Sequence, residues 1–353
     1  MATVNPVQKK SVKTRFLNLL GLTDQTTIKL YHGYGQSHQL MIMGHIFSLS
    51  PMPRYKYTKS LLKNSFSLLR LFIVRTLPDA TLQTEWKGRK IYAKGDKNGF
   101  FKFEWKDEGE LEQGWHELTV HLLNEVGGIK AEGKGSIYIP HFTQYGYISD
   151  IDDTFLISHS ANLRKRLYLL FTKHARTRKP FEGVVKHYQL LTAGLTTPEA
   201  PNPFFYVSSS EWNLYDFLLE FTTVNGLPRG VFLLNVLKQW TQLFKTGQNN
   251  HQTKFTRIVR ILENYPRQRF VLLGDSSQHD PQIYEAVVKH FPKQIHAVYI
   301  RDVHEVNKEN THSILSNIES AGVACCFFQH STEAILHSQK IGLIPEQVLV
   351  EQQ

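Results

Sequence analysis

The chain has 353 residues, 41% of them hydrophobic, so it is long enough for two domains with buried cores and is not a disordered scaffold. Its formal net charge of +10 favours polyanionic partners in general: nucleic acid, anionic lipid surfaces or phosphorylated small molecules. Because the sequence contains neither zinc-finger spacing nor a basic-region heptad, we do not expect nucleic acid to be the partner.

The N-terminus carries several lysines before the short apolar stretch FLNLLGL (16–22), which is too brief for the core of a signal peptide. No uncharged apolar run approaches the ~18 residues of a membrane span. The two cysteines, Cys325 and Cys326, are adjacent and form no disulfide framework, which is typical of a reducing compartment. We therefore expect a soluble cytoplasmic protein, and peripheral attachment to a membrane stays open.

The first 140 residues have the pattern of β structure. In GFFKFEW (99–105) aromatic residues alternate with charged ones, which is the period of a half-buried strand. ELTVHLL (117–123) and GSIYIP (135–140) continue the pattern. A helical spacing of apolar residues at 62, 66, 69 and 73 is the exception. The sequence predicts a mainly-β sandwich domain over residues 1–140 with one inserted helix, ending at Pro140.

From residue 141 to 353, short apolar runs alternate with amphipathic stretches such as 253–265 and 281–291. This alternation predicts an α/β domain with a parallel sheet and helices on both faces. In such sheets the ligand site lies beyond the carboxyl ends of the strands. The expected strands are YGYISDI (145–151), PFFYVS (203–208), RFVLLG (269–274), HAVYIR (296–301) and GVACCFF (322–328).

The first of these runs ends in SDIDDT, with Asp150, Asp152 and Asp153 within four residues. Carboxylates this close repel one another unless a positive group lies among them. A calcium loop does not fit, because its sixth position would be Phe155 rather than glycine and its twelfth would be Ala161 rather than glutamate. We interpret the cluster as functional.

The later strand ends supply further polar groups. The third run leads into GDSSQHD, which contains Asp275 and Asp280. Oxygen ligands without thiolates describe a hard-cation site, and Mg²⁺ fits such a sparse carboxylate set. Ser208 ends the second run and could hold phosphate oxygens, whereas Ser210 is expected to cap a helix near residue 212. Lys254, just before an expected helix, could supply the positive group that such a site needs.

The ordered set DIDDT, YVSSS, a lysine before a helix and GDSSQHD resembles the four motifs of the haloacid dehalogenase (HAD) superfamily. The flanking segments YGYISDIDDT, RKPFEGVVKHYQLL, FFYVSSSEWNLYDFL, FVLLGDSSQHDPQIY and VYIRDV are similar to the phosphatidate phosphatase family of the actin-patch-protein type. The N-terminal IKLYHGYG and DKNGFFKF are similar to the β-domain of that family. Glu211 departs from the proline expected before the Trp-Asn pair. The resemblance implies a Rossmann-like HAD catalytic domain over residues 141–353.

The resemblance also implies the chemistry. Asp150 would attack phosphorus, and Asp152 would protonate the leaving alkoxide and then activate water. Ser208 and Lys254 would stabilise the transferring phosphoryl group. Asp150, Asp152, Asp275 and Asp280 would surround one Mg²⁺ ion. The implied enzyme is a Mg²⁺-dependent phosphatase that converts phosphatidate to diacylglycerol and phosphate through an aspartyl-phosphate.

Two other functions stay open at this point: a phosphatase acting on a soluble phosphate monoester, and a phosphatidate-binding module without turnover. A nucleic-acid binder has no motif behind it. Between Thr154 and Glu182 the sequence contains no acid, and its segment 164–179 combines seven cations with nearby leucines. Such a basic amphipathic segment is able to lie on an anionic membrane, although a solvated helix packed on the sheet has the same pattern.

Overall fold

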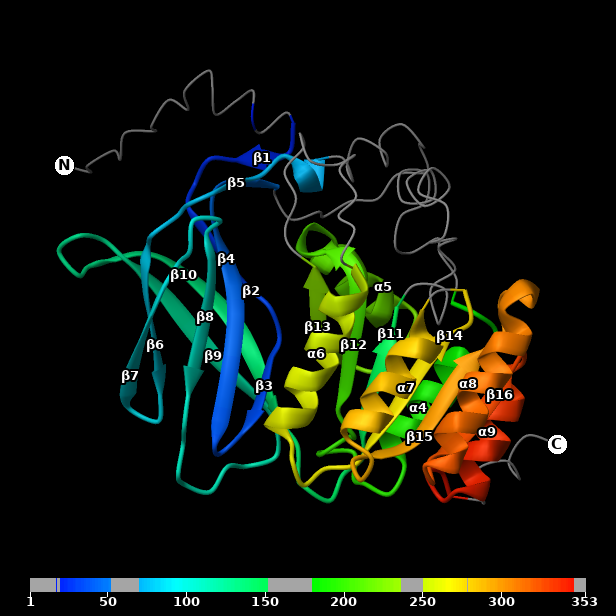
Figure 1. The fold of residues 1–353 in the computed structure, drawn as a ribbon. Coiled ribbons are helices and arrows are strands. Elements are labelled where there is room, and N and C mark those ends of the chain that lie inside the picture. The colour runs from blue at the N-terminus through cyan, green and yellow to red at the C-terminus, as the bar shows by residue number, and fades with distance from the viewer. Residues whose placement is uncertain are drawn as a thin grey trace, which may run out of the picture.

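The computed structural model describes residue 17 and residues 20–51, 70–151, 180–235, 250–277 and 279–345. Within these residues the strands form one ten-stranded sheet and one six-stranded sheet. Figure 1 shows the first sheet beside the second, with the long helices gathered around the second. A mainly-β N-terminal region followed by an α/β region with a parallel sheet is therefore confirmed.

The first sheet contains every described strand before residue 140. Its strands are β1 (Leu22–Thr23), β2 (Thr27–Leu30), β3 (Gly33–Gln36), β4 (Gln39–Pro51), β5 (Arg75–Thr76), β6 (Thr81–Trp86), β7 (Arg89–Lys94), β8 (Phe100–Trp105), β9 (Gly114–Leu123) and β10 (Ile129–Ile139). A 3₁₀ helix, η1 (Arg70–Phe72), precedes β5. The helix expected from the spacing at 62, 66 and 69 lies outside the described residues.

Alternating burial explains why these sequences form strands. Along β8 the aromatic residues Phe101, Phe103 and Trp105 are buried, and the intervening Lys102 and Glu104 are exposed. They share one hydrophobic core with side chains from β2, β4, β6, β9 and β10, so the sheet wraps around a common interior. The three expected strands of this region are confirmed. The division into two domains at residue 140 stays a prediction.

The second sheet is parallel throughout, in the order β13-β12-β11-β14-β15-β16. Its strands are β11 (Gly146–Asp150), β12 (Phe204–Glu211), β13 (Gly230–Asn235), β14 (Phe270–Asp275), β15 (Ile295–Arg301) and β16 (Ala324–Phe328). The helices are α4 (Val184–Ala193), η3 (Trp212–Leu214), α5 (Tyr215–Val224), α6 (Asn250–Asn264), α7 (Asp280–His290), η5 (Glu305–Asn307), α8 (Lys308–Ser320) and α9 (Ser331–Lys340). The sequence prediction missed β13.

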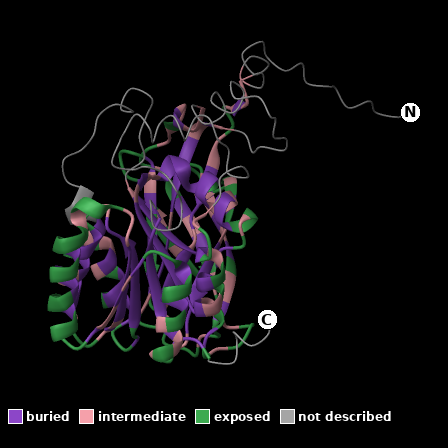
Figure 2. Ribbon diagram, turned by 90° about the vertical axis from the view of Figure 1, so that its right-hand side faces the viewer, coloured by how far each residue is buried: buried purple, intermediate pink, exposed green. Residues whose placement is uncertain are grey.

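Helices cover both faces of this sheet because successive strand residues belong to different cores. Tyr147 and Val271 pack in one core with residues of α4, α5 and α9. Ile148 and Leu272 pack in the other core with residues of α6, α7 and α8. Figure 2 shows the strands buried between helices whose outer faces are exposed. The near-continuous apolar runs of the sequence follow from burial on both faces.

The two sheets contact each other through aromatic and cationic side chains. The ring of Tyr31 stacks on that of Trp212, with 3.9 Å between the ring centroids, and the Tyr31 hydroxyl lies 2.8 Å from Nδ1 of His45. Arg229 lies over the ring of Trp115, 3.9 Å from its centroid, and donates a hydrogen bond to Ser136 Oγ. These contacts join the β region to the lateral edge of the α/β sheet that β12 and β13 form.

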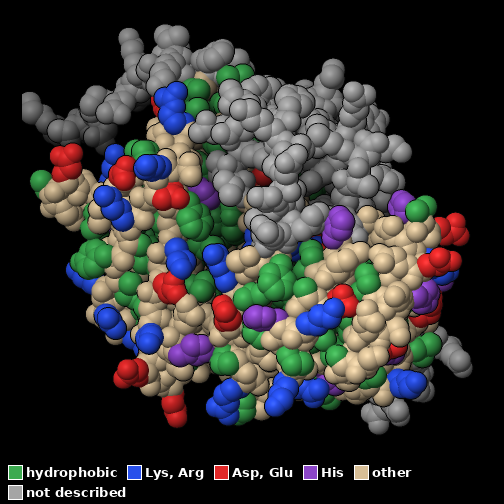
Figure 3. Space-filling view, in the orientation of Figure 1, with side chains coloured by type: hydrophobic (Ala, Val, Ile, Leu, Met, Phe, Trp, Pro, Cys, Tyr) green, Lys and Arg blue, Asp and Glu red, His purple; other side chains and the backbone are tan. Residues whose placement is uncertain are grey.

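Figure 3 shows lysine and arginine interspersed with acidic residues over the described part of the face it presents. The excess of 41 basic over 31 acidic residues belongs to the whole sequence, and the described residues carry only part of it. Among the described helices, none is long and apolar enough to cross a membrane. The basic segment 164–179 lies outside the described residues.

Replacing Tyr31 tests the contact between the sheets. Tyr31→Ala should lower the free energy of unfolding by about 3–5 kcal/mol, because it removes a buried ring that both regions contact. Tyr31→Phe keeps the ring and should cost about 1–2 kcal/mol for the lost hydrogen bond. The measurement is the urea midpoint with an unchanged m value. Equal losses in the two variants would contradict the contribution assigned to the stacked ring.

Candidate active site

Three carboxylates meet at the carboxyl ends of two neighbouring strands. Asp150 is the last residue of β11, Asp275 is the last residue of β14, and these strands pair in parallel. Asp280 is the first residue of α7. One carboxylate oxygen from each residue lies within 4.8 Å of the others, and all three residues are at most 2% exposed. Residues separated by more than a hundred positions thus form a single buried cluster.

Lys254 lies among these acids. It belongs to α6, and its Nζ lies 2.8 Å from Asp150 Oδ1 and also contacts Asp280 Oδ1. The lysine is only 4% exposed. Burial alone would lower the pKa of Lys254, but the charges of Asp150 and Asp280 and the hydrogen bonds to both raise the pKa above its usual value. The lysine therefore stays protonated and holds its two acids in place.

Asp275 has no such ion pair with Lys254. Burial raises the pKa of Asp275 to about 7, and the charge of Asp280 acts in the same direction. A hydrogen bond from Ser277 and the charge of Lys254 oppose this increase. Within the part of the chain that the structure describes, three acids of the cluster therefore face one lysine that contacts two of them.

Backbone groups fix the orientation of these carboxylates. The amide of Ser277 donates to Asp275 Oδ1 over 2.6 Å, and the amide of Asp275 donates to Asp280 Oδ2 over 3.4 Å. Gly274 makes the second contact possible, because a Cβ there would lie 2.6 Å from Asp280 Oδ2. The approach of α7 to β14 therefore requires glycine at position 274.

Ser208 lies one residue beyond Val207, which pairs with Asp150 across β12 and β11. It is fully buried, and its Oγ accepts a hydrogen bond from the amide of Ser210 over 2.9 Å. The expectation that Ser210 caps a helix is wrong. Ser210 is a buried residue of β12, and Glu211 precedes the 3₁₀ helix η3 without a side-chain cap. The strand continues further than the apolar run because β12 pairs with β13 as far as Glu211.

Two arginines near this edge of the sheet were not among the residues expected from the sequence. Arg257, one turn after Lys254, donates to the backbone oxygen of Ser208 over 3.0 Å. Arg301, the last residue of β15 and 4% exposed, pairs in register with Asp275 and donates to Ser331 Oγ over 2.7 Å. For Arg301 the available signal was its place at the end of an apolar run. For Arg257 there was no signal, because most arginines on amphipathic helices are solvated.

The structure thus brings together Asp150, Lys254, Asp275 and Asp280, with Ser208 on the adjoining strand. Asp152, expected as an acid, base and ligand, lies outside the described residues. The described acids fit a hard divalent cation, because they offer oxygen donors, are buried, and have excess negative charge. Without a metal ion, Asp275 keeps its proton to a higher pH than an ordinary aspartate does, because burial and the charge of Asp280 raise its pKa to about 7.

The family model described as "Phosphatidate phosphatase APP1, catalytic domain" matches residues 145–302. Over 156 residues, the chain is 31% identical to phosphatidate phosphatase APP1 of Saccharomyces cerevisiae, covering 44% of this chain and 25% of that protein. Over 158 residues, it is 25% identical to the uncharacterized protein C29B5.04c of Schizosaccharomyces pombe, with the same two coverages. Each alignment spans a quarter of the length of the relative. The recognition of the phosphatidate phosphatase family from its motifs is confirmed in the region that carries them.

Solved structures add little. A carbohydrate acetylesterase from Xanthomonas citri matches with a TM-score of 0.28 and 11% identity over 90% of this chain and 75% of its own. A Ca²⁺-stabilized ice-binding adhesin of an Antarctic bacterium matches with a TM-score of 0.20 and 10% identity over 35% of this chain and 26% of its own. Likenesses of this size support no conclusion about fold or function.

The raised pKa of Asp275 gives a pH-dependent prediction for metal-free protein. An acid with a raised folded-state pKa binds its proton more tightly in the folded chain, so its contribution lowers stability as pH rises from about 4 to about 7. Asp275→Asn keeps the acceptor for Ser277 and removes the charge. It should raise the melting temperature in EDTA at pH 8 and raise it clearly less at pH 5.

Asp79→Asn is the matched control, because it makes the same chemical change at an exposed carboxylate in the connection between β5 and β6. It should leave the pH profile of the melting temperature unchanged. If Asp275→Asn destabilises the metal-free protein equally at pH 5 and pH 8, the charge repulsion inferred for this cluster is wrong.

Proposed function

We propose, from the match of residues 145–302 to the catalytic domain of the phosphatidate phosphatase family, that this protein is a Mg²⁺-dependent phosphatase that hydrolyses phosphatidate. The products would be diacylglycerol and phosphate. The observation that carries the proposal is the buried cluster of three carboxylates within 4.8 Å of one another, in contact with Lys254. A purely structural core would gain more from apolar side chains than from so many buried charges.

The proposal includes a HAD-type arrangement of the α/β region. In this arrangement the nucleophile follows a central strand of the parallel sheet, and the metal-binding acids follow its neighbour. The position of Asp150 at the end of β11, inside the sheet between β12 and β14, supports this assignment. The pairing of β11 with β14, which ends in Asp275, supports it as well.

Mg²⁺ would be held by Asp150, Asp275 and Asp280, together with Asp152 from the sequence motif. When bound, it would offset negative charge on the acids and on the transferring phosphoryl oxygens. Catalysis of phosphoryl transfer depends mainly on positioning the substrate and on stabilising the negative charge of the transferring group. Lys254 fits the same role, because it is a buried cation held next to the nucleophile.

In the first step, an oxygen of the Asp150 carboxylate forms a bond to phosphorus while the bond to the ester oxygen breaks. Asp152 gives its proton to the departing alkoxide, which leaves as diacylglycerol. Lys254 favours the ionised Asp150 that this attack requires.

In the second step, the ionised Asp152 takes a proton from water, and the resulting hydroxide attacks the aspartyl-phosphate. Phosphate leaves, and Asp150 returns to its carboxylate form. Ser208 and Lys254 would donate hydrogen bonds to the phosphoryl oxygens in both steps.

Asp150→Asn should abolish turnover, because an amide oxygen is a poor nucleophile for phosphorus. We expect Mg²⁺-dependent phosphate release from phosphatidate in mixed micelles to fall by at least about 10³-fold. Trapping with ³²P-labelled substrate should yield an acid-stable phosphoprotein from wild type and none from the variant.

Glu285→Gln is the matched control, because it removes one carboxylate from the helix that carries Asp280, at a residue paired with Lys289. Its activity should stay within about 2-fold of wild type, since surface substitutions have small effects. Phosphate release from soluble phosphate esters is measured in parallel to identify the substrate class. If it is faster than phosphate release from phosphatidate, the substrate is a soluble ester and not the lipid. Full activity in Asp150→Asn would exclude the proposed mechanism.

We also propose that the basic segment 164–179 holds the enzyme on an acidic membrane, since phosphatidate lies in a bilayer. The composition of the segment supports this, with each cation near an anionic surface contributing about 1 kcal/mol. Flotation with phosphatidate-containing vesicles should recover the protein at low salt and release it at high salt. Indifference to both phosphatidate content and salt would contradict membrane docking.

A further inference from the structure

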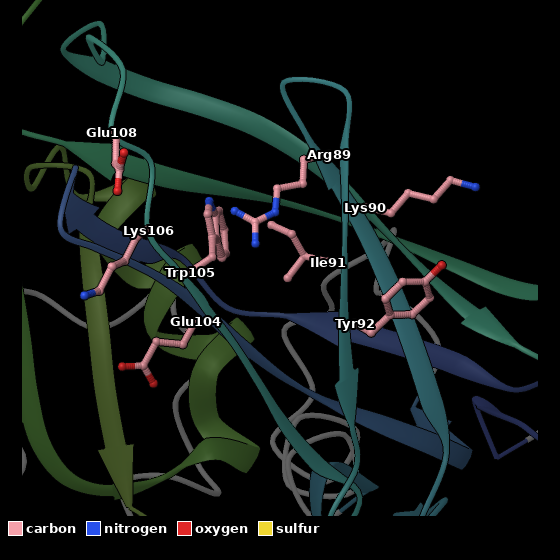
Figure 4. A pocket seen from close by; sticks show the side chains of 8 residues that line it. All are labelled: Arg89, Lys90, Ile91, Tyr92, Glu104, Trp105, Lys106 and Glu108. Carbon is pink, nitrogen blue, oxygen red and sulfur yellow. The ribbon is translucent and has the colours of Figure 1, made fainter.

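The pocket of the β region does not explain what this region contributes to the molecule. The pocket occupies about 490 Å³ between β7 and β8, and its charged lining residues carry both signs: Arg89, Lys90 and Lys106 with Glu104 and Glu108 (Figure 4). A cleft concentrates charged ligands when one sign of charge lines it, so this gap favours neither anions nor cations. The β region bears on the active site elsewhere, through its contact with η3.

The segment 208–211 at the end of β12 departs from regular strand pairing. Among the described residues, β12 is last paired with β11 at Val207. Its ladder with β13 is regular up to Val207 and shifts register before it resumes at Glu211. Arg257 of α6 holds the backbone oxygen of Ser208 from one side. The position of Ser208 therefore also depends on what holds the chain just beyond Glu211.

The β region holds the chain at that point. η3 begins at Trp212, whose ring stacks on that of Tyr31 with an angle of 16° between the ring planes. The next residue, Asn213, donates from Nδ2 to the backbone oxygen of Leu71 in η1 over 2.9 Å. Trp212 and Asn213 are each only 8% exposed. Two consecutive residues of η3 are thus fixed by two separate elements of the β region.

The contact continues into the core and into α5. Tyr31 and Phe72 of the β region belong to the same hydrophobic core as Trp212 and Tyr215. The hydroxyl of Tyr215 accepts a hydrogen bond from the backbone amide of His32 over 3.0 Å. Because close-packed interiors have few voids and transmit strain, η3 has little freedom to shift against the β region.

We propose that the β region positions Ser208 in the active site by holding η3, which makes Trp212 and Asn213 positioning residues. This inference rests on the proposed function for the role of Ser208, a hydrogen bond to the transferring phosphoryl group. A misplacement of about 1 Å caused by a mutation far from the chemistry is able to cost about 10²-fold in rate. The contacts with the β region therefore affect catalysis through the position of Ser208 and not through contact with substrate.

Asn213→Ala in the full chain tests the proposal, because it removes the hydrogen bond to Leu71 and leaves Ser208 and the carboxylates present. We expect kcat for phosphate release from phosphatidate to fall at least about 10-fold, with KM and the Mg²⁺ concentration for half-activation within about 2-fold of wild type. In the Ser208→Ala background, Asn213→Ala should lower kcat by less than about 2-fold, because the group that it positions is already absent.

Tyr31→Leu is a second variant, so that the test does not depend on the folding of Asn213→Ala. It removes the stacked ring from the side of the β region and should show the same loss of kcat and the same coupling to Ser208→Ala.

Arg229→Gln is the matched control, because Arg229 joins the same two regions at the other end of β13. It directly precedes Gly230, the first residue of β13, and donates to Ser136 Oγ over 2.6 Å. The urea midpoint should fall in this variant as it does in Asn213→Ala, whereas its kcat should stay within about 2-fold of wild type.

Amide hydrogen exchange reports on the segment 208–211 without an assay of activity. Exchange in this segment should become several-fold faster in Asn213→Ala and Tyr31→Leu and stay unchanged in Arg229→Gln. The proposal is overturned if exchange stays unchanged in the first two variants or rises equally in all three. It is also overturned if the losses of kcat in Asn213→Ala and Ser208→Ala multiply as independent effects. A wild type that releases phosphate from no ester would refute the proposed function, whereas the exchange rates would still decide whether the β region positions this segment.

Discussion

The mutual repulsion of three buried carboxylates is the constraint on which the site depends. Two like charges 4.8 Å apart repel by about 3 kcal/mol at an effective dielectric constant of 20. Lys254 offsets this for Asp150 and Asp280, which it contacts, and leaves Asp275 with a raised pKa. A divalent cation would balance the remaining negative charge, so that no acid needs to take up a proton. The same arrangement that destabilises the empty cluster therefore gives affinity for a metal.

The parallel sheet makes this arrangement possible. Because all strands of the second sheet run in one direction, their carboxyl ends meet at one edge, and Asp150 and Asp275 become neighbours through the pairing of β11 with β14. The helices add the rest: α6 supplies Lys254 and α7 supplies Asp280. Burial on both faces holds the strands rigidly, so the carboxylates cannot move apart to relieve their repulsion.

The sequence predicted those parts of the fold and site that local patterns encode. Apolar runs located β11, β12, β14, β15 and β16, and the acids at their ends indicated the cluster. It missed β13, whose run GVFLLN follows a helix and leads to no motif. It misassigned Ser210, because the extension of β12 depends on pairing with β13. Arg257 and Asn213 could not be predicted as functional residues, since they become distinctive only through contacts with distant segments.

The central claim is that one divalent ion binds among Asp150, Asp275 and Asp280. Crystals grown with Mn²⁺ in place of Mg²⁺ test it most directly through anomalous scattering at the manganese edge. The account predicts one strong peak in contact with oxygen atoms of these three residues, with Lys254 next to Asp150. An empty cluster in which Lys254 remains the sole cation, with manganese bound elsewhere or absent, would contradict it.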